Sequence, residues 1–281
     1  MLTGDATTAL GFAELVGVLL AAGLAAGFVA GLFGIGGGFV VVPVLLSVFS
    51  VFKVDPSVSM HVAIGTSLAT IILTSARSVL AHHRHGAVDL QILKDWAPWL
   101  TLGVTVGLVF ALWLDGHSLK VVLAAGLLLM GVHFIFPLVR FSKPVSTEMP
   151  RGASRAGIAT FLGAFSALLG IGGGVIGVLV MTACGRTIHQ AVATAAGFGI
   201  LIALPGAIGF ALLGLGRSEL PVGSIGYINL IALAAIASMS VITAPLGARA
   251  AHKLNPAALK HVFGLYLIGT SGILLFNAFA H

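Results

Sequence analysis

Apolar runs long enough to cross a lipid bilayer dominate this chain. Of its 281 residues, 58% are hydrophobic and 8% are charged, whereas about 25% of the residues of a typical soluble domain are charged. A chain with so few charged groups cannot cover its surface with hydrated side chains, so lipid must solvate much of it. The apolar runs are 11–33, 36–52, 59–82, 97–114, 118–139, 154–170, 172–184, 188–215, 225–247 and 258–280.

Two of these runs are short for a spanning helix, which needs about 20 apolar residues with a range of about 17–25. They are 36–52 and 172–184, and both begin directly after a glycine cluster. Clustered glycines release backbone groups from a helix, and such breaks occur in membrane proteins where the backbone is buried. The sequence therefore predicts either spanning helices that break at the glycines or re-entrant hairpins, and it leaves both open.

The glycine clusters also reveal an internal repeat. Residues 34–38 (Gly-Ile-Gly-Gly-Gly) recur as 170–174, 136 positions later, and residues 61–67 resemble 189–195 at an offset of 128. Small residues precede both clusters at the four-residue spacing that lets membrane helices approach closely: Gly23, Gly27, Gly31, Ala159, Gly163 and Ala167. Leu119-Lys120 and Leu259-Lys260 match at an offset of 140. We expect a first transmembrane repeat in 1–139 and a second in 154–281.

Basic residues set the expected orientation. With the N-terminus outside and one crossing per run, nine basic residues fall inside and four outside, as the positive-inside rule requires. The inside set is Arg84, Lys94, Arg140, Lys143, Arg151, Arg155, Arg186, Arg249 and Lys253, and the outside set is Lys53, Lys120, Arg217 and Lys260. The polar segment 140–153 is then a central cytoplasmic loop. The expected fold class is all-α: a polytopic membrane protein with about eight to ten transmembrane segments. An odd number of crossings per repeat makes the second repeat enter the membrane upside down, so we expect two inverted-topology repeats.

The glycine clusters are the leading candidate for a binding site. Helix N-termini and unpaired N–H groups buried in mid-membrane attract a negative ligand, and two such ends would meet if the repeats are inverted. Close helix packing, with glycine as a spacer, is the alternative. The candidate substrate-binding backbones are Gly36, Gly37, Gly38, Gly172, Gly173 and Gly174.

Matched polar side chains are further candidates for substrate binding. Thr66, Ser67 and Thr194 lie at equivalent places in the two halves, although membrane hydroxyls also bond to their own helix backbone. His61 and His189 are matched at the starts of two runs, where an interfacial role is the alternative. Arg77 lies inside an apolar run; an intramembrane arginine marks a functional site unless it extends to the interface.

Several function classes find no support in the residues. The basic residues punctuate apolar runs instead of forming a patch, which excludes nucleic-acid binding. The single Cys184 allows neither an intrachain disulfide nor a cysteine metal cage. A His-Glu-x-x-His motif, a Gly-x-Ser-x-Gly motif and paired carboxylates are missing, so we predict no enzyme, no catalytic residues, no metal and no cofactor. A membrane scaffold or accessory protein without transport is the alternative to a transporter.

The motifs together resemble one family. The paired Gly-x-Gly-Gly-Gly clusters, the stretch Ala63-Ile64-Gly65-Thr66-Ser67-Leu68 and the turn that ends at Asp89 are similar to the TauE/SafE sulfite exporter-like family, over about Leu15 to Leu275. The resemblance implies a permease for sulfite, sulfoacetate or related sulfonates. The chain departs from the pattern at 193–195, where Ala-Thr-Ala replaces Gly-Thr-Ser, and this puts the ligand set of the second half in question.

Energetics favour export of such an anion. A potential that is negative inside drives anions outward by about 2.3 kcal/mol per charge per 100 mV. Import would need coupling to protons or sodium, and Glu14 is the one carboxylate inside an apolar run. We therefore expect a multi-pass protein of the bacterial inner membrane that exports a small anion and contacts membrane lipid. The sequence leaves the oligomeric state open, including a homodimer.

Overall fold

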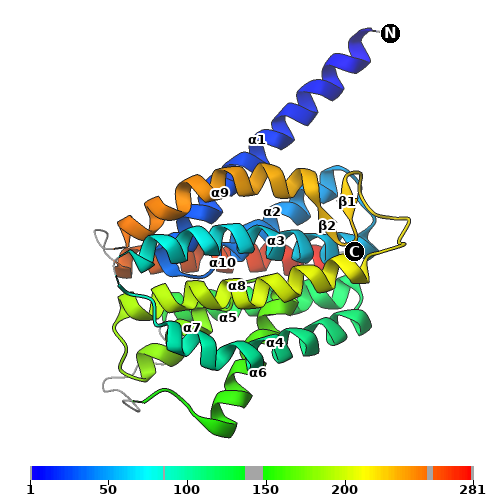
Figure 1. Ribbon diagram of the computed structural model, residues 1–281. Helices are drawn as coiled ribbons and strands as arrows, with labels where there is room; N and C mark the ends of the chain where they lie inside the picture. The colour runs from blue at the N-terminus through cyan, green and yellow to red at the C-terminus, as the bar shows by residue number, and fades with distance from the viewer. Residues whose placement is uncertain (1, 85, 137–147, 252–255, 280–281) are drawn as a thin grey trace.

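The computed structural model describes residues 2–84, 86–136, 148–251 and 256–279, and in this part of the chain ten helices form one bundle (Figure 1). The elements are α1 (Leu2–Phe33), α2 (Gly38–Val51), α3 (Pro56–His83), α4 (Leu90–Trp113), α5 (Gly116–Ile135), α6 (Gly152–Leu169), α7 (Gly174–Ala183), α8 (Ile188–Leu213), β1 (Ser224–Ile225), β2 (Ile228–Asn229), α9 (Leu230–Ala250) and α10 (Pro256–Phe279). The predicted all-α fold is confirmed.

Eight of the described helices are long and apolar enough to cross a membrane. The exceptions are α2, with 14 residues, and α7, with 10 residues. At a rise of about 1.5 Å per residue they span about 21 Å and about 15 Å, less than the bilayer core of about 30 Å. These two helices are the short runs that follow the glycine clusters, so the chain is a multi-pass integral membrane protein with two interrupted segments.

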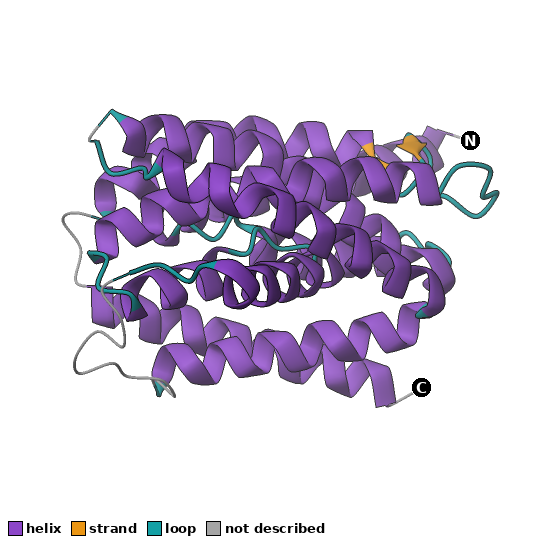
Figure 2. Ribbon diagram, turned by 60° about the horizontal axis from the view of Figure 1, so that its bottom comes forward, coloured by secondary structure: helices purple, strands orange, loops and turns teal. Residues whose placement is uncertain are grey.

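The first glycine cluster lies where the chain reverses direction between α1 and α2. Gly31, near the end of α1, lies beside His82 at the end of α3, because the His82 Nε2 is 3.3 Å from the Gly31 carbonyl oxygen. The helix α2 then returns to the other end of the bundle, where α3 begins. The first cluster and α2 together therefore lead from one end of the bundle to the other. Figure 2 shows loop segments passing between the helices in the interior, and both chain ends at one end of the bundle.

Most basic residues gather at the end of the bundle where α3 ends and α4 begins, and we call it the basic end. Its described members include Arg77, Arg84, Lys94, Arg151, Arg155, Arg186 and Arg249, whereas Lys53, Lys120 and Arg217 lie at the opposite end. The expectation for Lys260 is wrong: α10 starts at Pro256, directly after the loop from α9, and so its first turn belongs to the basic end. Arg140, Lys143 and Lys253 lie outside the described residues.

Small residues bring two helix pairs into close contact. The helix α1 packs along α9, and α6 packs along α4. A Cβ atom at Gly27 would collide with Ser240 of α9, and one at Gly163 would collide with the Leu100 carbonyl of α4. The four-residue spacing of small residues is confirmed as a packing motif in both halves.

Helices α3 and α8 form the centre of the bundle and pack on each other. Side chains cap the N-termini of four helices by accepting hydrogen bonds from otherwise unpaired backbone N–H groups. They are Asp55 for α3, Asp89 for α4, Asp115 for α5 and Asn229 for α9. A capping box of Thr187 and Gln190 begins α8. The predicted run 225–247 was too long at its start, because 224–229 forms the β1–β2 hairpin before Asn229 caps α9.

The segment between the two predicted repeats is described in part. Residues 148–151 precede α6 without helical structure. Residues 140–147 of the expected central loop 140–153 lie outside the described residues. The bounds 1–139 and 154–281 of the two repeats remain a prediction.

Candidate functional site

The two glycine clusters cross in the interior, and every one of their residues is buried. We call 34–38 the first glycine loop and 170–174 the second glycine loop. A Cβ atom on Gly38 would collide with the carbonyl oxygen of Gly170, and a Cβ atom on Gly174 would collide with that of Gly34. The loops therefore touch at reciprocal positions, the first residue of each against the last residue of the other.

The backbone of each loop has N–H groups without hydrogen-bond partners in the described part of the chain, at the start of its short helix. Gly37 and Gly173, the N-cap residues of α2 and α7, have φ angles of 81° and 67°, a left-handed conformation that favours glycine. Neither has a side chain to cap the helix. Among the described residues, no hydrogen bond uses the N–H groups of the three glycines that close each loop, and these are Gly36, Gly37, Gly38, Gly172, Gly173 and Gly174.

Unlike these N–H groups, two carbonyl groups at the crossing already accept hydrogen bonds from side chains. Ser67 Oγ on α3 donates to the Gly170 carbonyl over 2.7 Å. Thr74 Oγ1, on the same helix, lies 3.2 Å from the Gly36 carbonyl and shares its proton with its own helix backbone. The loops therefore present unpaired donors, while two of their acceptors are occupied.

Two buried serines beside the second glycine loop have no hydrogen-bond partner among the described residues. They are Ser75 on α3 and Ser166 on α6, with 1% and 0% of their surface exposed. Ser75 Oγ lies against Gly199, which in turn contacts Gly172, and Ser166 Oγ lies 3.2 Å from the place of a Cβ atom on Gly173. A buried hydroxyl without a partner is costly, so its presence points to a bound polar group or water.

The matched threonines anchor helix starts. Thr66 Oγ1 accepts a hydrogen bond from the N–H of Asn229 over 2.9 Å, and Thr194 Oγ1 accepts one from the N–H of Asp89 over 3.0 Å. Both partners are N-cap residues, of α9 and α4, and they are 140 positions apart. The structure thus places Thr66 and Thr194 at equivalent positions on opposite sides of the glycine loops.

A cavity adjoins each of these anchored helix starts. At the basic end, a cavity of about 340 Å³ is lined by Asp89, Arg186, Gln190 and Thr194 among others. The Arg186 guanidinium lies 3.9 Å from the Asp89 carboxylate and its Nε is buried without a hydrogen-bond partner. At the opposite end, a cavity of about 490 Å³ is lined by Lys53, Asp55, Glu219 and Asn229 among apolar side chains.

The other predicted residues lie away from the glycine loops. His61 is buried near the opposite end, where its Nε2 is 3.2 Å from the Ala111 carbonyl oxygen and its ring stacks on Tyr227. His189 is exposed in the first turn of α8, and Arg77 is exposed on α3. The structure therefore brings the six loop glycines together with Ser67 and leaves His61, His189 and Arg77 outside this group.

Comparison with known proteins decides the family. A family model described as "Sulfite exporter TauE/SafE" matches residues 19–274. The chain belongs to this family. A probable membrane transporter protein of Haemophilus influenzae is 35% identical over 249 residues, which cover 89% of this chain and 94% of the relative. One of Methanocaldococcus jannaschii is 26% identical over 94% of this chain and 96% of the relative. No solved structure matches the chain.

The family assignment makes the chain a membrane transporter, as its curated relatives are named. In this TauE/SafE protein, Asp89 and Asn229 were not predicted from the sequence as equivalent helix caps, although their separation equals the repeat offset of 140. It also missed Ser75 and Ser166. No repeat signal marks these two, because the equivalent positions hold Ala203 and Ala30.

Proposed function

We propose that this TauE/SafE protein is a secondary transporter that exports a small sulfur-containing anion, sulfite or a small sulfonate, by alternating access. The anion binds at the crossing of the two glycine loops. One observation carries the proposal: at a buried crossing, the backbone donors and two serine hydroxyls are unpaired, whereas two carbonyl acceptors already have donors.

The polarity of the free groups favours an anion over a cation. A cation would need carbonyl or carboxylate oxygens, but Ser67 and Thr74 donate to the carbonyls of Gly170 and Gly36. An anion needs N–H and O–H donors, and helix N-termini add a favourable dipole. The short helices α2 and α7 both start at the crossing, so their positive ends face one place.

The reciprocal contacts of the two halves support the proposal of alternating access. Exchanging the two halves turns the contact of Gly38 with Gly170 into that of Gly174 with Gly34, and turns the pair Thr66–Asn229 into Thr194–Asp89. Such reciprocity is the expectation for two inverted repeats that rock about a central site. The cavities at the two ends are then the two entrances, and buried contacts between the loops close the path between them.

Arg186 is the residue we assign to the cytoplasmic entrance. Its guanidinium lines the cavity at the basic end together with Thr194 and the polar side chain of Gln190. The nearby Asp89 carboxylate, 3.9 Å away, is too distant for a tight charged hydrogen bond. An arriving anion would therefore meet a cation that still has donors to offer.

The variant Gly172→Ala tests the site with little disturbance of the fold. A Cβ atom there would lie 3.2 Å from the Gly199 Cα and 3.3 Å from the Ile35 carbonyl oxygen, so neighbours need to move by a few tenths of an ångström. The methyl group would fill space between the loops. We expect the efflux of sulfite from proteoliposomes with a clamped potential to fall by about tenfold or more, which corresponds to about 1.4 kcal/mol.

The matched control is Gly157→Ala. This glycine is on α6, and a Cβ atom on it would have no neighbour within 4 Å, so efflux should be unchanged. Normal efflux by a folded Gly172→Ala protein would contradict the site. A thermal-shift comparison of sulfite, sulfate, thiosulfate and small sulfonates then ranks the substrates, because a ligand that binds the folded state raises the melting temperature.

Two alternatives make distinct predictions. An importer coupled to protons or sodium would show flux that depends strictly on an inward gradient of that ion, whereas the uncoupled exporter needs none. A scaffold without transport would show no flux for any anion, and glycine substitutions would change its abundance alone.

A further inference from the structure

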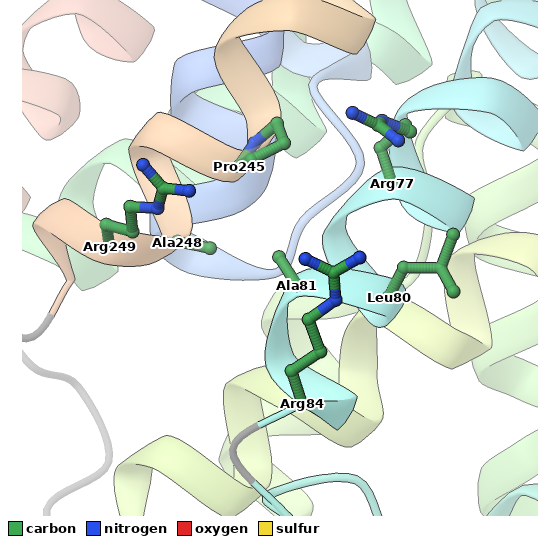
Figure 3. A pocket seen from close by; sticks show the side chains of 7 residues that line it. All are labelled: Arg77, Leu80, Ala81, Arg84, Pro245, Ala248 and Arg249. Atoms are coloured by element: carbon green, nitrogen blue, oxygen red, sulfur yellow. The ribbon is translucent and has the colours of Figure 1, made fainter.

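Three arginines surround a pocket at the basic end, apart from the glycine loops. The pocket has a volume of about 170 Å³ and lies between the end of α3 and the end of α9. Figure 3 shows the guanidinium groups of Arg77 and Arg84 on α3 and of Arg249 on α9 around this opening. The remaining lining is apolar or small and consists of Leu80, Ala81, Pro245 and Ala248.

The three positive charges are uncompensated within the described part of the chain. The ion pairs found there join Arg151 to Glu148, Arg155 to Asp95 and Arg186 to Asp89. None of them includes an arginine of the pocket, and no carboxylate lines it. Three guanidinium groups held together without a counter-charge repel one another, so a ligand with negative charge would stabilise this arrangement.

The surface next to the pocket is the kind that faces lipid chains. Going from the pocket toward mid-membrane, α3 exposes Leu80 and Leu73, which are 55% and 45% exposed, and α9 exposes Leu246 and Ile242, which are 48% and 59% exposed. Arg77 and Arg84 are seven residues apart on α3, about 10 Å along the helix. The charged groups thus lie at the basic end of two apolar helix faces.

The repeat provides an internal contrast. By the offsets of 128 and 140, the positions equivalent to Arg77, Arg84 and Arg249 are Pro205, Leu212 and Val109, at the opposite end of α8 and α4. Leu212 and Val109 are exposed and apolar. The scaffold therefore does not require charge at this place, and the arginines are present at the basic end alone.

We propose that this pocket binds the phosphate headgroup of an anionic phospholipid from the cytoplasmic leaflet, with the acyl chains along the exposed faces of α3 and α9. A basic pocket between transmembrane helices on the cytoplasmic side suits such a headgroup, since each arginine near the surface strengthens binding by roughly fivefold. Arg77, the intramembrane arginine that the sequence singled out, then holds lipid and not the transported anion. The ligand class is a phosphatidylglycerol or a cardiolipin.

The test compares lipids and arginines in one purified protein. Native mass spectrometry of the detergent-solubilised chain, titrated with phosphatidylglycerol, cardiolipin or phosphatidylcholine, counts bound lipids. We expect tight binding of an anionic lipid, weakened by roughly fivefold for each of Arg77→Gln, Arg84→Gln and Arg249→Gln, and no equivalent binding of phosphatidylcholine. Arg217→Gln, which removes a basic residue at the opposite end, is the matched control and should leave binding unchanged.

The proposal would be overturned if the wild type and the three arginine variants bound the anionic lipid equally well. Equal weakening by Arg217→Gln would also overturn it. So would competition by inorganic phosphate or sulfite at concentrations similar to that of the lipid. The last result would make the pocket a site for a free anion. Arg84→Lys, which keeps the charge, guards against a folding defect and should retain most of the binding. Loss of lipid binding with unchanged sulfite efflux would leave the transport site intact, so the two proposals can fail separately.

Discussion

The first and second glycine loops share their backbone plan but differ in the side chains around them. In each loop a left-handed glycine, Gly37 or Gly173, precedes the first residue of a short helix, and each loop packs its last residue on the first residue of the other. The unpaired hydroxyls differ, however: Ser166 Oγ lies beside Gly173 of the second loop, and Ser75 Oγ lies against Gly199, which contacts Gly172 of the same loop. At the equivalent positions beside the first loop the chain has Ala203 and Ala30.

The two loops therefore match in their backbone and differ in the polar side chains that lie beside them. Backbone N–H groups come from both loops, because glycine geometry repeats. The side-chain donors come from one side, so the bound anion should lie closer to the second loop than to the first. Four predictions test how far the equivalence and the asymmetry go.

The largest effect is expected where the two loops touch. Gly38→Ala and Gly174→Ala would each drive a Cβ atom into a carbonyl oxygen of the other loop. Overpacking of this kind costs about 1–3 kcal/mol and more against rigid backbone. We expect both variants to lose stability to a similar degree in thermal unfolding in detergent. A well-tolerated alanine at one position and not at the other would show that the contacts are not equivalent.

The threonine anchors come next. Thr66→Val and Thr194→Val keep the shape of the side chain but leave the N–H of Asn229 or Asp89 without its acceptor. A buried unpaired donor costs about 1–3 kcal/mol. Because Asn229 is buried and Asp89 is partly exposed to solvent, Thr66→Val should lower the unfolding temperature more. A larger loss for Thr194→Val would contradict this ranking.

The asymmetry itself is tested by Ser166→Ala and Ser75→Ala. Neither serine has a hydrogen-bond partner within the described residues, so removing the hydroxyl should not lower stability without a ligand. Sulfite efflux should fall by about tenfold, the effect of one lost hydrogen bond to a charged group. Ser238→Ala, at an exposed position on α9, is the control, and unchanged efflux in both buried variants would remove the serines from the site.

The smallest effect concerns acid sensitivity. In the first half α3 and α5 are capped by Asp55 and Asp115, whereas Thr187 and Asn229 cap α8 and α9. Hydrogen bonds from Ser57 and Ser118 lower the pKa of Asp55 and of Asp115 below the usual 3.8. A lowered folded pKa means that the caps stabilise the fold above about pH 3.8 and lose this effect as the pH falls through the folded pKa.

Unfolding measured between about pH 6 and about pH 3 should therefore show a slight acid destabilisation that Asp55→Asn and Asp115→Asn reduce. Asn229→Ser on α9 should leave the acid sensitivity unchanged. If this variant changed the pH profile as much as the aspartate variants do, the assignment to the first-half caps would be wrong.

Much of the fold could be predicted because membrane solvation imposes it. The run lengths locate the spanning helices, and the glycine clusters locate both interruptions to within a few residues of α2 and α7. The close pairs α1–α9 and α4–α6 were not predictable as pairs, since the small residues mark a contact face without naming its partner. The start of α4 was also missed, because Asp89 caps it before the polar residues Lys94 and Asp95.

The candidate site was predictable in its backbone and less so in its side chains. Glycine runs have a specific conformational use, so the six loop glycines stood out. Thr66 and Thr194 also stood out through the repeat, but their roles as acceptors for helix starts depend on distant residues that touch them in the fold. Ser75 and Ser166 resemble many other small polar residues in membrane helices, and nothing local distinguishes a paired hydroxyl from an unpaired one.

The reciprocal contact between the glycine loops constrains how a path through the protein could open. Gly34 lies against Gly174 and Gly38 against Gly170, so a displacement of one loop alone would break both contacts. A movement that frees the substrate toward one compartment and keeps these contacts carries both short helices together. A mechanical link of this kind disfavours a state open to both compartments, and it would spare the cell a standing leak of its ion gradients.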